Sequence, residues 1–238
     1  PDIHAEGRFE KAEREVKQFR DEYVISGMME WTLFEQAWYL RGYREFLRDL
    51  YTNEKFVNNL LDRLLDWRIQ QGKYFLDIGC DIIRLGDDIG MQTGMILPPH
   101  IWRKYFRPRM KKLIDTLRKR GVYIHYHSDG NIEPVIPELI EIGVQILNPV
   151  QSDCMKPAGI KQKFGDKLTF DGTISVQETL PFGTPEDVEN EVVNRIKTVG
   201  YDGGLMIGPT HVIDIDASSE NILALYDTAK KYGKYPIA

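Results

Sequence analysis

Two histidines and an aspartate have the side-chain types and spacing of a metal site. His127 and Asp129 stand two residues apart, and His211 lies far downstream. Imidazole and carboxylate groups suit zinc, and three protein ligands leave a fourth position open for water or substrate. Cys154 is a possible further ligand. The His-x-Asp spacing also arises by chance, so the alternative that His127 is an interior histidine bonded to a neighbouring strand stays open.

A second group of charged residues lies in segment 82–88, which the sequence predicts to be a strand. The group consists of Arg84, Asp87 and Asp88, which could bind an anion or transfer a proton. Successive side chains of a strand point to opposite faces, so placing the apolar residues outward selects Arg84 and Asp88 for the interior. A buried arginine needs an anionic partner, which is either a protein carboxylate or an acidic substrate. We therefore predict Asp88, Arg84 and His127 as catalytic residues.

Polar residues stand at the carboxyl end of nearly every predicted strand. Active sites of parallel α/β folds lie at the carboxyl ends of their strands, so these residues are expected to gather at one face. The segments are Gly86-Asp-Asp88, His127-Ser-Asp-Gly130, Asn148-Pro-Val-Gln151, Asp171-Gly-Thr173 and Gly208-Pro-Thr-His211. We predict Asn148 and Gln151 as substrate-binding residues. Trp31 and Trp38 join them if the aromatic-rich segment 31–50 lines a pocket, and the alternative is an ordinary core stripe.

Strand and helix patterns alternate six times along the chain, which predicts an α/β fold with parallel strands. The predicted strands are 23–27, 82–88, 122–127, 144–148, 167–172 and 204–208. The predicted helices are 9–20, 31–50, 54–77, 98–120, 132–141, 157–164, 185–199 and 219–232. A closed (β/α)8 TIM barrel has eight strands and about 250 residues. We expect one domain over 1–238, a barrel lacking its first two βα units, because six strands begin abruptly at Pro1 rather than Met. Such a fragment is expected to be poorly stable alone.

Composition narrows the class of protein. Hydrophobic residues make up 42% of the chain and charged residues 28%, which is ordinary for a globular protein. The net charge of −5 is spread along the chain, so no nucleic-acid partner is indicated. There is no apolar run of about 18 residues and no signal peptide, so neither a membrane span nor secretion is expected. Two cysteines suit the reducing cytoplasm.

Several of these segments together resemble the uroporphyrinogen decarboxylase superfamily, nearest its methylcobalamin:coenzyme M methyltransferase-like branch. The segments that carry the resemblance include Gly86-Asp-Asp-Ile-Gly90, His127-Ser-Asp-Gly-Asn131, Gly143–Gln151, Phe164–Gly172 and Leu180-Pro-Phe-Gly-Thr-Pro185. The resemblance implies a barrel longer than this chain. It also implies corrinoid-linked methyl transfer, with zinc as the metal and the corrinoid supplied by a partner protein. The alternatives are decarboxylation of a porphyrinogen, or binding of a tetrapyrrole or corrinoid protein without catalysis.

The resemblance also assigns the metal ligands. In the methyltransferase branch zinc is held by a His-x-Cys pair and by a cysteine after the last strand. His127 matches the histidine, Asp129 stands at the first cysteine, and His211 is the candidate after the last strand. Because soft thiolates help zinc activate a thiol, their replacement leaves the methyl acceptor open.

Overall fold

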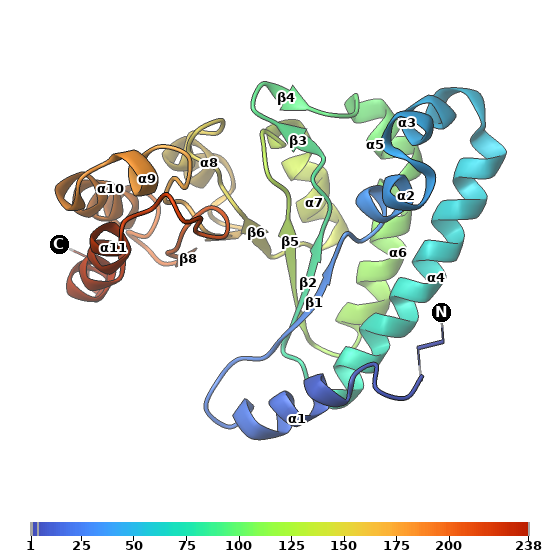
Figure 1. The fold of residues 1–238 in the computed structure, drawn as a ribbon, viewed down its shortest axis with the longest axis horizontal. Helices are drawn as coiled ribbons and strands as arrows, with labels where there is room; N and C mark the ends of the chain where they lie inside the picture. The colour runs from blue at the N-terminus through green and yellow to red at the C-terminus, as the bar shows by residue number, and fades with distance from the viewer. Residues whose placement is uncertain (1, 4, 238) are drawn as a thin grey trace. The chain divides into compact units, whose positions relative to one another are not determined.

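The computed structural model describes residues 2–3 and 5–237, and these form two compact units. The first unit comprises Pro1–Ile89, Leu97–His127 and Val135–Val144. The second comprises Gly90–Ile96, Ser128–Pro134 and Gln145–Ala238. Figure 1 shows both, with the first in blue and green and most of the second in yellow to red.

The first unit is built on three parallel strands, β1 (Ser26–Glu30), β2 (Ile82–Gly86) and β5 (Tyr123–His127), which pair in that order. The register places Arg84 opposite both Met28 and His125. The long helices α4 (Glu54–Ile78) and α6 (Arg107–Arg118) lie side by side over these strands (Figure 1). The other helices are α1 (Glu10–Phe19), α2 (Phe34–Arg41), α3 (Tyr43–Thr52), α5 (Pro99–Tyr105) and α7 (Ile136–Ile142).

Helix α4 shows why the sequence folds in this way. Its apolar residues recur at helical spacing, and Val57, Leu61 and Leu65 are buried. The Asn53 side chain accepts a hydrogen bond from the amide of Phe56 and so caps the first turn. Gly79 ends the helix at φ 101°, a left-handed conformation that glycine adopts without steric cost. Its bounds agree with the prediction to within a residue.

The second unit repeats the architecture with three short parallel strands. These are β6 (Ile146–Asn148), β7 (Thr169–Asp171) and β8 (Leu205–Met206), again paired in chain order. Helices α10 (Pro185–Thr198) and α11 (Ser219–Tyr232) pack against each other, with α8 (Pro157–Phe164) and α9 (Thr179–Phe182) completing the unit. Thr184 and Asp187 form a reciprocal capping box at the start of α10, as the sequence predicts. The hairpin of β3 (Gly90–Met91) and β4 (Gly94–Met95) also belongs here.

The six parallel strands confirm the predicted α/β class, and all six fall near the predicted segments. The first needs correction, because β1 begins at Ser26 rather than Tyr23. Tyr23 and Val24 are 62% and 70% exposed, whereas Met29 is buried. The β-branched pair before Ser26 suggested a strand, but burial on the pleated surface decides where it lies.

Two predicted helices are each divided in the structure. Segment 31–50 becomes α2 and α3, separated by Gly42 at φ 92°. Segment 98–120 becomes α5 and α6, because Pro108 has no N–H to donate and its ring clashes with the preceding turn. Segment 132–141 begins as a 3₁₀ turn, Glu133–Val135, before α7. The β3–β4 hairpin and α9 were not predicted. Among the described residues no helix is both long and apolar enough to cross a membrane.

Candidate functional site

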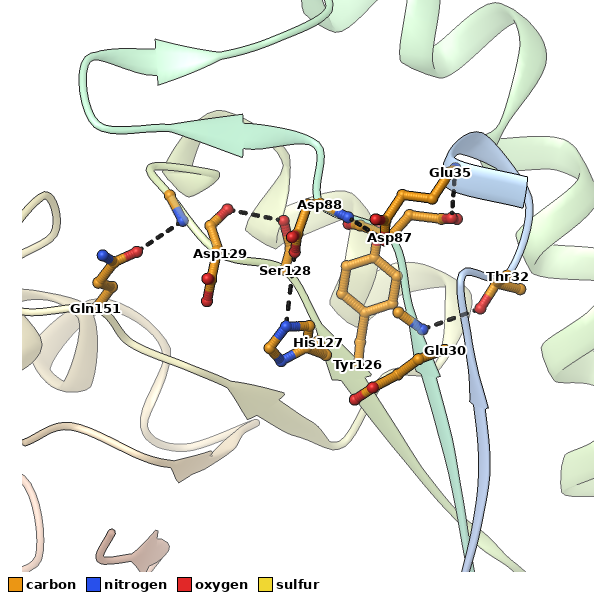
Figure 2. A network of polar contacts seen from close by, with 12 residues as sticks. Glu30, Thr32, Glu35, Asp87, Asp88, Tyr126, His127, Ser128, Asp129 and Gln151 are labelled. Carbon is orange, nitrogen blue, oxygen red and sulfur yellow. Dashed lines mark hydrogen bonds and ion pairs between the residues drawn. The ribbon is translucent and has the colours of Figure 1, made fainter. Parts of the chain in front are cut away.

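The carboxyl ends of the strands of the first unit carry several ionisable side chains. Glu30 ends β1, Asp87 and Asp88 follow β2, and His127 ends β5. Glu35 joins them from the first turn of α2. Figure 2 shows these residues, with Glu35, Asp87 and Asp88 close together and the His127 ring directed toward Asp88. β2 ends at Gly86, so both aspartates lie in the following loop and not on the strand as predicted.

Asp87 is the buried member of the pair. Its side chain accepts hydrogen bonds from the amide of Leu33 at 3.0 and 3.1 Å and from the amide of Glu35 at 3.0 Å. Burial raises the pKa of Asp87 to about 6, and these backbone donors oppose the rise. Asp87 therefore fixes the start of α2, a role that the strand-based prediction did not give it.

Glu35 is a second buried carboxyl, 7% exposed. Its Oε2 accepts a hydrogen bond from the amide of Asp88 at 3.0 Å (Figure 2). Burial is the main cause that raises the pKa of Glu35 to about 7, and the nearby carboxylates of Asp87, Asp88 and Glu30 raise it further. At neutral pH this group exchanges a proton readily, which is the property of a general acid or base.

Arg84 lies on the opposite face of β2 from the buried Ile83 and Leu85, as alternation requires. Its Nε donates to Glu30 Oε1 at 2.5 Å, so a protein carboxylate is one partner of this arginine. Its Nη2 lies 3.4 Å from Nδ1 of His127.

Two contacts bear on the orientation of the His127 ring. Arginine can only donate, so the approach of Arg84 suits a lone pair on Nδ1 of His127. The other ring nitrogen, Nε2, lies 3.6 Å from Asp88 Oδ1. His127 is 8% exposed, so protein contacts and not bulk water hold its orientation.

Trp31 and Trp38 belong to a cluster of aromatic rings in the first unit. The Trp31 and Tyr39 ring centroids lie 5.8 Å apart in an edge-to-face arrangement, and those of Trp38 and Tyr39 lie 4.0 Å apart. Trp38 also meets Tyr43 edge to face at 5.4 Å. Trp31 and Tyr39 are more than half exposed, whereas Phe34 and Phe46 of the same predicted segment are buried core residues.

In the second unit, Asp129 stands on a loop that is fixed by backbone contacts. The amide of Gly130 donates to Gln151 Oε1 at 2.9 Å, and Ser128 Oγ donates to the Asp129 carbonyl at 3.0 Å (Figure 2). Gly130 has φ 80°, and a Cβ atom there would lie 2.3 Å from the backbone of Gly90. Only glycine fits between the loop and the β3–β4 hairpin.

Asp129 and His211 approach each other although 82 residues separate them in the chain. A carboxylate oxygen of Asp129 and a ring nitrogen of His211 lie within 4.8 Å. His211 is exposed, and Asp129 is half-buried. An imidazole and a carboxylate at this separation fit the donor set of a zinc ion. His127 is joined to Asp129 through Ser128 alone.

The other predicted site residues of the second unit, Asn148, Gln151 and Cys154, make hydrogen bonds to neighbouring loops. Asn148 Nδ2 donates to the carbonyl and carboxylate of Asp171 at 3.0 and 3.1 Å. Gln151 holds Gly130 as described, so both amides have structural partners. The Cys154 thiol contacts the Gln151 carbonyl at 3.7 Å. Burial, together with the charges of Asp153 and Asp129, raises the pKa of Cys154 to about 11, so it is a thiol at neutral pH.

Sequence reasoning missed two buried groups of the first unit, Glu35 and Arg68. Arg68 is 4% exposed and donates to the backbone carbonyls of Thr32 and Trp31 at 3.1 and 2.5 Å. One signal was present in the sequence. Both residues lie within stretches rich in apolar residues, Leu33-Phe-Glu-Gln-Ala37 and Leu64-Leu-Asp-Trp-Arg68.

Comparison with known proteins gives one family and a set of methyltransferases. Residues 13–232 match the family model described as uroporphyrinogen decarboxylase (URO-D). A methylcobamide:CoM methyltransferase of Methanosarcina acetivorans is 25% identical over 184 residues, 77% of this chain and 52% of the relative. A methylated-thiol–coenzyme M methyltransferase of Methanosarcina mazei is 20% identical over 83% of this chain and 51% of the relative. The chain thus spans about half the length of these relatives.

Solved structures show the same fold. A methyltransferase from Methanosarcina mazei superimposes with a TM-score of 0.77 at 17% identity, over 93% of this chain and 63% of that one. A sugar phosphate isomerase/epimerase from Parabacteroides distasonis gives a TM-score of 0.52 at 9% identity, over 95% of this chain and 79% of that one. With the parallel strands, the first match identifies the fold as that of a partial URO-D-like TIM barrel.

Proposed function

This chain belongs to the uroporphyrinogen decarboxylase family, and on that premise we propose that it takes part in corrinoid-linked methyl transfer. The observation that carries the proposal is the approach of Asp129 and His211 to within 4.8 Å, because it brings together two groups able to bind a metal. The methylcobamide:CoM methyltransferases among its relatives support a corrinoid as methyl donor. The corrinoid would come from a partner protein.

His127, Asp129 and His211 would hold the metal, for which zinc is the best fit to two imidazoles and one carboxylate. A zinc ion held there supplies a Lewis acid for the methyl donor or acceptor. Cys154 would be a further ligand only after its thiol has lost its proton, because a metal binds the thiolate.

The charged residues of the first unit would orient the substrate and the histidine. Asp88 faces Nε2 of His127 and would orient the ring, and a metal would then bind Nδ1 in place of its present contact with Arg84. A carboxylate beside a ligating histidine increases the basicity of the ring. Glu35 accepts a hydrogen bond from the amide of Asp88 and would hold or release a proton, because its pKa of about 7 is near physiological pH.

Both cysteines are free, which fits a reducing cytoplasm as the place of this activity.

The decisive experiment measures zinc content and methyl transfer on the same preparations. The parent chain is expected to bind one zinc ion and to demethylate methylcobalamin when a thiol such as coenzyme M is supplied. His127→Ala, Asp129→Ala and His211→Ala should each weaken zinc binding at least tenfold. Cys80→Ala is the matched control, because Cys80 is a buried core residue of the first unit.

Three results would contradict the proposal. The first is unchanged zinc affinity in all three variants. The second is a parent chain that binds zinc but never demethylates methylcobalamin. The third is a metal-free chain that decarboxylates a porphyrinogen, which would favour the alternative activity of the family.

A further inference from the structure

Trp31 has a backbone conformation that a tryptophan rarely adopts. Its φ is 58°, and it is the one non-glycine residue with a positive φ among residues 2–3 and 5–237. Such a conformation is strained and persists only where the surroundings impose it. The Trp31 side chain is 54% exposed, so its burial does little to offset the backbone strain.

Arg68 of α4 donates hydrogen bonds to the backbone carbonyls of the turn that contains Trp31. Its Nη2 donates to the Trp31 carbonyl at 2.5 Å and to the Glu30 carbonyl at 3.3 Å. Its Nε donates to the Thr32 carbonyl at 3.1 Å. Three successive carbonyls therefore point to one buried guanidinium. Gln71 Oε1 accepts a further bond from Arg68 at 2.6 Å.

The Asp87 carboxylate accepts hydrogen bonds from the backbone amides at the other end of the same turn. The bonds from the Leu33 and Glu35 amides secure the chain directly after Thr32. Thr32 itself is fully buried, and its hydroxyl donates to Met29 and accepts from the amide of Gly86. A buried charge is costly unless it is hydrogen-bonded. Arg68 and Asp87 satisfy this requirement with the backbone of a single turn.

Trp31 follows the last residue of β1, which belongs to the charged site. Its neighbour Glu30 pairs with Arg84, and Arg84 in turn lies beside His127. The indole itself meets Tyr39, which is 55% exposed and packs on Trp38. Glycine would adopt this backbone conformation at no cost. The exposed ring is therefore the reason for a tryptophan at this position.

We infer that Arg68 and Asp87 are positioning residues that clamp the turn Glu30–Leu33, so that the Trp31 indole forms a contact surface for the macrocycle of the ligand. The inference rests on the proposed function, from which the ligand class is taken: a corrin ring. The clamp consists of the side chains of Arg68 and Asp87 and the backbone of one turn, and it includes none of the three proposed metal ligands.

Trp31→Gly tests the indole without removing the clamp. The dissociation constant of methylcobalamin, measured by equilibrium dialysis, is expected to rise between about twofold and tenfold, the range of an aromatic contact. The melting temperature should stay the same or increase, since glycine relieves the backbone strain. Trp31→Ala should lose the same affinity and melt below the glycine variant. Tyr51→Ala is the control, as Tyr51 is also an exposed aromatic residue, at 61%.

Asp87→Asn tests the clamp through a double-mutant cycle. In the parent background this variant should weaken methylcobalamin binding, because one fixed acceptor and the charge are lost. In the Trp31→Gly background it should have little further effect, since there is no indole left to position. A residue with a merely structural role would give additive losses. Arg68→Lys repeats the cycle from the other side of the turn if Asp87→Asn does not fold.

The outcomes separate this inference from the proposed function. Unchanged binding by Trp31→Gly, or a glycine variant that melts below the alanine variant, overturns the inference alone. Additive losses in both cycles also overturn it. A clear Trp31 effect in a chain that neither binds zinc nor transfers methyl groups overturns the proposed function and leaves the inference standing. A parent chain that does not bind methylcobalamin overturns both.

Discussion

Asp88 Oδ1 lies 3.6 Å from Nε2 of His127, so a carboxylate stands beside one nitrogen of the ring. Replacing the carboxylate by an amide in Asp88→Asn keeps the shape and removes the charge. If His127 is a zinc ligand, the zinc affinity of this variant should fall about 10- to 100-fold. Competition with a chromophoric chelator measures it. Asp227→Asn on the exposed face of α11 is the control, and equal affinities in the two variants would contradict the role given to Asp88.

Glu35 makes the stability of the chain depend on pH. Its pKa is raised from 4.5 to about 7, so between these values the unfolded chain loses the proton while the folded chain keeps it. Stability should therefore fall as the pH rises through this window and stay lower above it, by an amount on the order of 3 kcal/mol.

Glu35→Gln removes this dependence. Urea unfolding should show the variant more stable than the parent at pH 8 and about equal to it at pH 4.5. Asp87 contributes a dependence of the same sign, but it is present in both proteins and cancels in the difference. Glu22→Gln, at an exposed position, is the control. A difference between Glu35→Gln and the parent that does not change with pH would contradict the assignment.

Gly130→Ala separates steric collision from backbone strain. Gly130 and Gly121 have nearly the same φ, 80° and 81°, but a Cβ atom at Gly121 meets nothing within 4 Å. Gly121→Ala should thus cost only the left-handed conformation, about 1–2 kcal/mol. Gly130→Ala should cost clearly more, because its Cβ would collide with the backbone of Gly90. Similar unfolding midpoints for the two variants would show that the hairpin moves aside.

The capping box of α10 offers a test that is independent of the site. Thr184→Ala removes the acceptor for the amide of Asp187 and should cost about 1 kcal/mol. Thr198→Ala, at the other end of the helix, is the matched control, since its hydroxyl only donates to the Asn194 carbonyl. The expected order of unfolding midpoints places Thr184→Ala below Thr198→Ala, and the reverse order would mean that α10 does not depend on its cap.

Local patterns were enough to predict most elements of the fold. The buried stripe and caps of α4, the capping box of α10 and the bounds of α8 and α11 are properties of adjacent residues, so the sequence shows them directly. The helix breaks at Gly42 and Pro108 were also visible, but the apolar periodicity on both sides concealed them. The β3–β4 strands of two residues each are too short to have a period.

The buried charges could not be predicted in the same way. Asp87 and Arg68 satisfy the backbone of a turn that lies 54 and 36 residues away from them in sequence. A pattern that treats charged residues as exposed will always assign them to the surface. Strand alternation predicted Asp88, and not Asp87, as the aspartate enclosed by the protein, because it extended the strand past Gly86, where β2 ends.

The strained turn at Trp31 has a consequence for how this chain would respond to selection. A library propagated only for folding and yield would be expected to replace Trp31 repeatedly with glycine, asparagine or aspartate, which tolerate a positive φ. Each replacement would relieve the backbone strain and remove the indole, so selection for stability at this position would lower the affinity for the ligand. Selection for stability and selection for ligand binding therefore oppose each other at position 31.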